Sequence, residues 1–140
     1  MNFSLSKDQI AIQKEARKYA NDKVLPRIEE AVFKRDLVEE MGELGFFGCA
    51  FPERFGGTAM GFLAHSLVCE EISRVDSGLR ALFNLQGMTV PYTIMEWGTP
   101  EVAEKYVEDL VLGRKIGCAC FSEPDAGSDL SSIHTLIEDK

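Results

Sequence analysis

Residues 118–130, CACFSEPDAGSDL, contain the side chains of this sequence with the clearest chemical potential. An apolar run with Cys118 and Cys120 in the alternation of a strand breaks abruptly into small, acidic and hydroxyl-bearing residues. Proline, aspartate, glycine and serine are turn residues, so the stretch can be an ordinary surface turn after a strand. Alternatively, its small side chains, hydroxyls and backbone N–H groups form a platform on which a ligand lies.

The cysteines and histidines do not predict a metal site. The cysteines are Cys49, Cys69, Cys118 and Cys120, with no Cys-x-x-Cys pair among them. Only His65 and His134 could join them, so a zinc site is not expected. Cys118 and Cys120 would share one face of a strand, too constrained to bridge each other easily. Free thiols in a reducing compartment are therefore predicted.

Charge and composition exclude some partners. The chain has 140 residues, 45% hydrophobic and 27% charged, with a formal net charge of -8. Such an acidic balance argues against nucleic acid or an anionic membrane as a partner, because both require a basic face. The sequence has neither a signal-peptide pattern nor an apolar run of membrane-spanning length. We expect an intracellular protein, cytoplasmic or, in a eukaryote, in the mitochondrial matrix.

Helical patterns must position the chemistry, and they occupy most of the chain. Ser6 and Gln9 form a capping box, and Ile12, Ala16 and Tyr19 behind it fall on one helical face. Further helical patterns cover residues 33–44, 62–74, 79–90 and 101–112, with a glycine-rich loop at 45–61. Stop and restart signals stand at Gly45, Pro91, Gly98, Thr99-Pro100 and Gly113.

After Lys115 the pattern alternates, and IGCACFS is predicted as a first strand. The expected fold is an all-α N-terminal helical domain of about five to six helices, residues 1–115. It is followed by the first strand or strands of a truncated β domain, residues 116–140. A lone strand cannot satisfy its own backbone, so we expect the chain to be a fragment of a longer protein.

The stretch CFSEPDAGSDLSS resembles the signature of the acyl-CoA dehydrogenases. That signature begins with a small residue, an aliphatic residue, Ser or Thr, and Glu. After two free positions it continues with a small residue, Gly, Ser or Thr, and Asp. The matching residues are Cys120, Ser122, Glu123, Ala126, Gly127, Ser128 and Asp129. Phe121 departs from the pattern, because the family prefers an aliphatic residue there. We call residues 118–130 the signature segment.

A second match lies upstream. FPERFGG, residues 51–57, resembles the Pro-Glu-x-aromatic-Gly-Gly loop that follows the first helices of this family. The order of helices, loop, helices and signature strand also agrees, so the resemblance covers essentially the whole chain.

The resemblance implies a flavoenzyme. Family members bind FAD between an N-terminal helical domain, a middle β domain and a C-terminal helical bundle. They remove an α-proton and a β-hydride from an acyl-CoA thioester, which leaves the 2,3-enoyl-CoA. The hydride goes to the flavin, and its electrons pass to an electron-transferring flavoprotein. A homotetramer or homodimer is expected for the full-length protein.

The resemblance also implies site residues. The cofactor-binding residues are Ala119, Cys120, Phe121, Ser122, Gly127 and Ser128, and the substrate-binding residues are Arg80, Asn84 and Ser128. The Ser122 hydroxyl and nearby backbone N–H groups can donate to a flavin ring. Ser128 is expected where FAD and the CoA thioester meet.

MGELG and RVDSGLR most resemble the glutaryl-CoA dehydrogenase subfamily. There an arginine at the position of Arg80 faces the distal carboxylate of the acyl chain. A Glu and a Ser assist it in that subfamily, where this chain has Ser73 and Asn84. Alternatively, Arg80 is a surface residue in the first turn of a helix.

No catalytic residue is predicted in this chain. The family's base is usually a glutamate of the C-terminal bundle, so the 140-residue piece alone is expected to be inactive. Two alternatives stay open: a helical interaction module that kept the fold without activity, and an acyl-CoA oxidase-type flavoenzyme. The yellow colour of bound flavin in the full-length protein would exclude the interaction module. Reoxidation of the reduced flavin by oxygen would distinguish an oxidase from a dehydrogenase.

Overall fold

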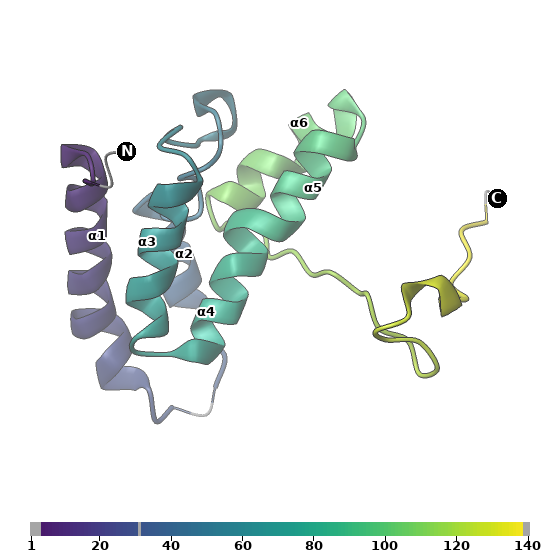
Figure 1. Cartoon of the computed structure of the whole chain (residues 1–140), viewed down its shortest axis with the longest axis horizontal. Coiled ribbons are helices and arrows are strands. Elements are labelled where there is room, and N and C mark those ends of the chain that lie inside the picture. The colour runs from purple at the N-terminus through teal and green to yellow at the C-terminus, as the bar shows by residue number, and fades with distance from the viewer. Residues whose placement is uncertain (1–3, 31, 139–140) are drawn as a thin grey trace.

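The computed structural model describes residues 4–30 and 32–138, which form six α-helices and no strand. The helices are α1 (Lys7–Tyr19), α2 (Arg35–Glu43), α3 (Phe62–Ser73), α4 (Ser77–Asn84), α5 (Val90–Trp97) and α6 (Pro100–Val111). They pack side by side, and the chain after α6 runs away from them in an extended path (Figure 1). None of the helices in these two ranges is long and apolar enough to cross a bilayer.

Helix α1 begins at the predicted capping box. The Ser6 hydroxyl accepts from the Gln9 N–H at 3.1 Å, and the Gln9 side chain accepts from the Ser6 N–H at 2.9 Å. Its predicted inner face, Ile12, Ala16 and Tyr19, is buried. Both signals are local in sequence, and both are confirmed.

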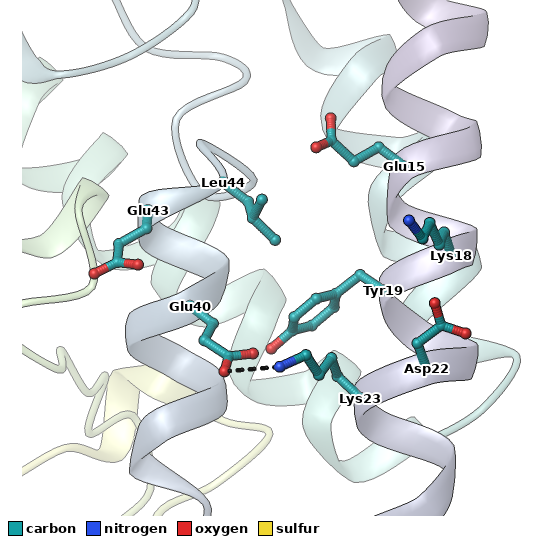
Figure 2. Close-up of a pocket in the computed structure, with 8 residues that line it drawn as sticks. All are labelled: Glu15, Lys18, Tyr19, Asp22, Lys23, Glu40, Glu43 and Leu44. Atoms are coloured by element: carbon teal, nitrogen blue, oxygen red, sulfur yellow. Dashed lines mark hydrogen bonds and ion pairs between the residues drawn. The ribbon is translucent and has the colours of Figure 1, made fainter.

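Helices α1 and α2 line an open groove of about 540 Å³ (Figure 2). Glu15, Asp22, Glu40 and Glu43 contribute four acidic side chains to it, beside Lys18, Tyr19, Lys23 and Leu44. Lys23 spans the groove to reach Glu40 at 3.4 Å. An anionic ligand such as a CoA thioester would meet an excess of negative charge here, and none of the predicted site residues lines the groove.

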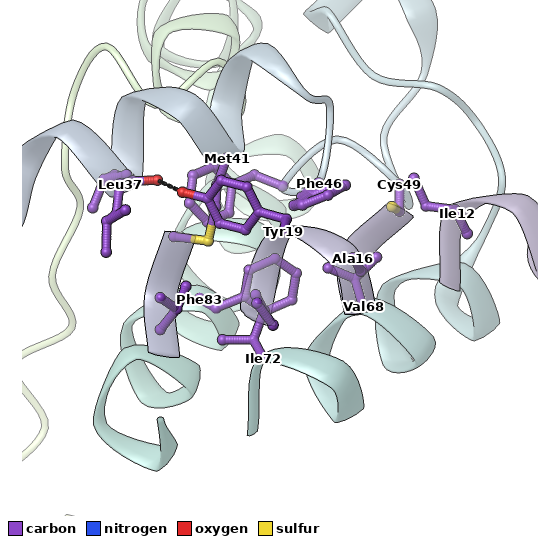
Figure 3. Packing of buried hydrophobic residues seen from close by; sticks show 14 of the residues in the cluster. Ile12, Ala16, Tyr19, Leu37, Met41, Phe46, Cys49, Val68, Ile72 and Phe83 are labelled. Atoms are coloured by element: carbon purple, nitrogen blue, oxygen red, sulfur yellow. Dashed lines mark hydrogen bonds between the residues drawn. The ribbon is translucent and has the colours of Figure 1, made fainter. Parts of the chain in front are cut away.

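The main core is formed by side chains of α1, α2, α3 and α4 and of the loop that follows α2 (Figure 3). Its large members include Tyr19, Leu37, Met41, Phe46, Phe47, Ile72 and Phe83. The Tyr19 and Phe46 rings meet edge to face with centroids 5.7 Å apart, and the Tyr19 hydroxyl donates to the Leu37 carbonyl at 3.1 Å. Burial raises the pKa of Tyr19 well above its usual value. A smaller cluster packs Phe51 and Phe55 of the loop between α2 and α3 against the buried face of α6, which includes Val107.

One ion pair fixes α3 against α1. The Glu71 carboxylate has almost no exposed surface and accepts two hydrogen bonds from Arg17, at 2.6 and 2.9 Å, and one from Arg74 at 2.9 Å. The Arg17 hydrogen bonds, aided by Arg74, hold the pKa of Glu71 below its usual range despite burial. The cost of desolvating this carboxylate is thus offset by two guanidinium partners.

The loop between α2 and α3 depends on two adjacent glycines for different reasons. Gly56 has φ +73°, in the left-handed region that favours glycine. At Gly57 a Cβ would lie 2.1 Å from the Phe51 carbonyl oxygen, so no side chain fits. The paired glycines of FPERFGG therefore close the loop back on itself around the buried Phe55 ring.

Two helix boundaries differ from prediction. Pro91 lies in the first turn of α5, as predicted, but the chain does not leave the helix before it, because a π-helical turn, Leu85–Thr89, carries α4 into α5 with helical backbone throughout. The wider turn accommodates the missing proline N–H. Phe33 was placed on the inner face of the second helix, but α2 begins at Arg35 and Phe33 is 62% exposed. Phe33 fits the apolar spacing of the helix that follows, but it lies two residues before the first residue of α2.

The predicted strand does not form among the described residues. Residues 116–122 are extended but pair with no other segment, and the nearest pairing is an isolated bridge between Glu123 and Ala126. A strand is stable only when neighbouring strands accept its backbone hydrogen bonds, and residues 4–30 and 32–138 form no such strand. The expectation of no strand among the helices up to residue 113 is confirmed within residues 4–30 and 32–113.

Candidate functional site

The signature segment presents backbone donors that nothing in the described chain uses. From Cys118 to Ser122 no backbone N–H donates to another described residue, and the Ser122 hydroxyl also lacks a partner there. Cys120, Phe121 and Ser122 are exposed, and Ala119 is half-buried. This row of free donors beside modest side chains fits a flat ring with carbonyl acceptors.

A tight turn follows the row. The backbones of Glu123 and Ala126 exchange two hydrogen bonds, of 2.7 and 3.3 Å, across Pro124-Asp125. The Glu123 carboxylate then accepts from the backbone N–H groups of His134 at 2.8 Å and Thr135 at 2.9 Å. These donors lower the pKa of Glu123. The glutamate of the motif therefore ties the chain after the turn back to its start.

Asp129 has a similar local function. Its carboxylate accepts from the Ser131 N–H at 3.1 Å and from the Ser132 hydroxyl at 2.6 Å, and so caps the short turn Leu130–Ser132. Sequence reasoning assigned no role to Glu123 or Asp129. The spacing of Asp129 before Ser131 is a recognisable capping signal, whereas nothing local pairs Glu123 with residues 134 and 135.

Gly127 and Ser128 lie between these two acids with space around them. A Cβ at Gly127 would meet nothing within 4 Å, so the described structure does not itself require a glycine. Ser128 is exposed, and its hydroxyl has no partner among the described residues. Both positions leave the backbone open to close approach by a ligand such as a phosphate.

The cysteines remain thiols. Cys118 and Cys120 are exposed with their Sγ atoms 4.0 Å apart, and all four cysteines are free. The neighbouring Cys120 raises the pKa of Cys118. No group of three or more His, Cys, Asp and Glu side chains within residues 4–30 and 32–138 could hold a metal ion.

The predicted substrate residues lie on α4. Arg80 is in its first turn, where the Asp76 carboxylate caps the helix by accepting from the Leu79 N–H at 2.9 Å. Arg80 is half-buried, and no carboxylate of the described chain forms an ion pair with it. Its charge acts on Cys69 of α3, whose pKa burial raises and Arg80 partly lowers. A half-buried guanidinium without a counter-ion is suited to an anionic partner.

Asn84 lies one turn further along α4 and faces His65 of α3. The Asn84 Oδ1 and His65 Nε2 atoms are 3.5 Å apart, and the His65 ring stacks on Phe83 with centroids 4.9 Å apart. His65 is buried, its Nδ1 has no partner among the described residues, and burial lowers its pKa. Sequence reasoning considered His65 only as a metal ligand, because the α3–α4 contact is not visible in the sequence.

The structure brings Arg80 and Asn84 together but does not bring them to Ser128. Arg80 and Asn84 share α4, whereas the signature segment lies along the chain that leaves the helices (Figure 1). The one described acidic side chain that is buried, Glu71, is held by Arg17 and Arg74, which keeps its pKa low and unsuited to a base. No described residue therefore combines burial and a free carboxylate near α4.

Comparison with known proteins identifies the family of the helical domain. Residues 6–114 match the family model for the acyl-CoA dehydrogenase N-terminal domain. Over its whole length the chain is 39% identical to glutaryl-CoA dehydrogenase of Desulfococcus multivorans, and it covers 38% of that protein. It thus spans little more than a third of this relative.

Solved structures give the same picture. A glutaryl-CoA dehydrogenase in complex with glutaryl-CoA is 39% identical with a TM-score of 0.85, over 95% of this chain and 35% of that one. An FAD complex of an acyl-CoA dehydrogenase from Bacillus anthracis is 27% identical with a TM-score of 0.86, over 93% of this chain and 23% of that one. The chain belongs to the acyl-CoA dehydrogenase N-terminal domain family.

Proposed function

We propose that this chain is the N-terminal part of an FAD-dependent acyl-CoA dehydrogenase that oxidises an acyl-CoA thioester to the 2,3-enoyl-CoA. The observation that carries the proposal is the row of unused donors from Cys118 to Ser122, at the end of a helical domain of this family. Residues 1–115 would be the helical domain and residues 116–140 the start of a middle β domain.

The described residues fit FAD. The Ser122 hydroxyl and the N–H groups of Ala119 to Ser122 would hold the isoalloxazine ring, and Gly127 and Ser128 would lie near phosphate. The bound flavin supplies hydride acceptance. The chain itself supplies these unused donors, and the acyl group's far end would meet α4. The α-proton would pass to a carboxylate base outside this chain, since no described acid is suited to the task.

The free guanidinium of Arg80 favours an acyl group with a distal carboxylate. The glutaryl-CoA dehydrogenase relatives act on or bind such a substrate by name. At the position where the subfamily has a glutamate, this chain has Ser73, which is exposed at the end of α3. Residue 73 therefore places no carboxylate beside Arg80. Asn84 can add an amide N–H to the same carboxylate. An electron-transferring flavoprotein would receive the electrons, and the full-length protein would form a homo-oligomer.

The test is Arg80→Ala in the full-length protein, with glutaryl-CoA compared against a neutral acyl-CoA of equal chain length. Stranding a buried carboxylate costs about 2–5 kcal/mol, so kcat/KM for glutaryl-CoA should fall roughly 30-fold to several thousand-fold. The neutral substrate should lose little. Equal losses for both substrates would make Arg80 structural, and a wild type without flavin would support the interaction-module alternative.

A further inference from the structure

Gln86 is the least expected buried polar residue of the helical domain. It lies in the π-helical turn Leu85–Thr89, two residues after Asn84, and is 1% exposed. A glutamine placed so deep in a protein must have its amide hydrogen-bonded, because an unpaired buried amide is costly. Its three partners show what it holds.

The Gln86 amide joins two segments that follow one another in the chain. Its Nε2 donates to the Leu110 carbonyl at 2.6 Å and to the Lys115 carbonyl at 2.7 Å. Its Oε1 accepts from the Gly117 N–H at 3.0 Å. Both amide hydrogens are thus used on carbonyls, and the oxygen accepts from the second residue after Lys115. One side chain thereby fixes the end of α6 and the start of the extended chain.

Packing reinforces this attachment. A Cβ at Gly117 would lie 2.6 Å from Val90 Cγ1, so the backbone there touches α5 directly. Beside it is a hollow of about 380 Å³ between α5 and α6, lined largely by apolar side chains. After Gly117, no backbone N–H up to Ser122 donates within the described chain. Among the described residues, the Gly117–Gln86 hydrogen bond is therefore the last one that holds the backbone before the unused N–H groups of Cys118 to Ser122.

The same helix also holds the acyl-binding residues. Arg80 and Asn84 precede Gln86 on one continuous helix from α4 into α5. Cys120 follows Gly117 by three residues, about 10 Å of extended chain. We propose that Gln86 is a positioning residue that sets the register between the acyl-binding helix and the flavin-binding segment. This rests on the proposed function, in which those two regions hold the two reactants.

The test is Gln86→Met in the full-length protein. Methionine matches the length of glutamine but can make none of the three hydrogen bonds, so Lys115 and Gly117 lose their attachment. We expect the dissociation constant for FAD to rise at least tenfold. With saturating FAD, kcat should fall at least tenfold while KM for the acyl-CoA changes less than threefold, because the acyl residues on α4 stay in place. The Gly117 amide should also lose its protection in hydrogen exchange.

The control is Val68→Ala, which removes two buried methyl groups from the α3 face of the main core, a cluster that does not include Gln86. It should lower Tm while FAD affinity changes less than twofold. If FAD affinity instead follows Tm equally in both variants, Gln86 is only structural and the proposal is wrong. If Gln86→Met does not fold, Gln86→Asn gives the same readouts, because its uncharged amide is one methylene too short to reach all three partners.

The two proposals fail differently. A wild type that never binds FAD removes the proposed function and the register proposal with it. A flavin-loaded wild type whose Gln86→Met variant keeps its FAD affinity and kcat overturns the register proposal alone.

Discussion

The helical domain and the signature segment differ in where their hydrogen bonds and buried surfaces come from. The helical domain buries aromatic rings from α1, from α4 and from the loop between α2 and α3, and it buries a doubly paired carboxylate. The signature segment buries only the Ala126 side chain, and the backbone N–H groups from Cys118 to Ser122 are unused among the described residues. The most specific motif of the sequence thus lies where the chain makes fewer internal hydrogen bonds and buries fewer side chains than in the helical domain. Residues selected for a ligand and for a neighbouring sheet need not stabilise the chain that carries them.

Matched substitutions in the two regions test this difference, and the largest effect is expected from an aromatic pair. Phe46 has no exposed surface, whereas Phe121 is 57% exposed. Phe46→Ala should lower the free energy of unfolding by about 3–5 kcal/mol, because it leaves a cavity in the core. Phe121→Ala should change it by less than about 0.5 kcal/mol. Urea unfolding of the 140-residue chain measures both, and a comparable loss for Phe121→Ala would show hidden packing in the signature segment.

A pair of carboxylates gives the second effect. Glu71 and Glu123 both accept several hydrogen bonds and both have a lowered pKa, but only Glu71 is buried. Glu71→Gln should cost about 1.5–3 kcal/mol, the range for hydrogen bonds to charged groups. Glu123→Gln should leave global unfolding unchanged and only loosen residues 134 and 135, as seen by hydrogen exchange.

The same pair predicts a pH dependence. Because the pKa of Glu71 is lowered in the folded protein, the unfolded chain binds a proton first as the pH falls below about 4.5. The stabilisation by Glu71 is therefore present at neutral pH and is lost in acid, as the pH passes through the folded pKa. Between pH 6 and pH 3, Tm of the wild type should fall further than Tm of Glu71→Gln. Parallel curves would mean that Arg17 and Arg74 do not hold the carboxylate in solution.

The smallest effect concerns the two histidines. His65 is buried with a lowered pKa, and His134 is exposed. Between the ordinary pKa of 6.5 and the lower folded value, the unfolded chain binds more protons at His65, so stability falls as the pH drops from 7.5 to 5.5. His65→Gln should flatten Tm over this window, and His134→Gln should leave it as in the wild type. A steeper response in His134→Gln would place a pH-sensitive contact in the chain after the signature segment.

Local sequence determined most of the helical domain. The capping box at Ser6, the inner face of α1, the start of α6 at Thr99-Pro100 and the turn at Gly113 all follow from side chains within a few residues. Such signals work at short range because helical hydrogen bonds connect residues four apart. The signature motif was recognisable for the same reason, since its order of residues is itself local.

Tertiary structure decided the rest. That Glu71 meets Arg17, that His65 faces Asn84 and that Gln86 holds Gly117 depend on how helices pack, and a single sequence does not display those pairings. The helix through Pro91 required a π-helical turn that no residue type announces. The strand at 116–122 is absent among the described residues for the opposite reason: its alternation is local, but a strand exists only when other strands share its hydrogen bonds.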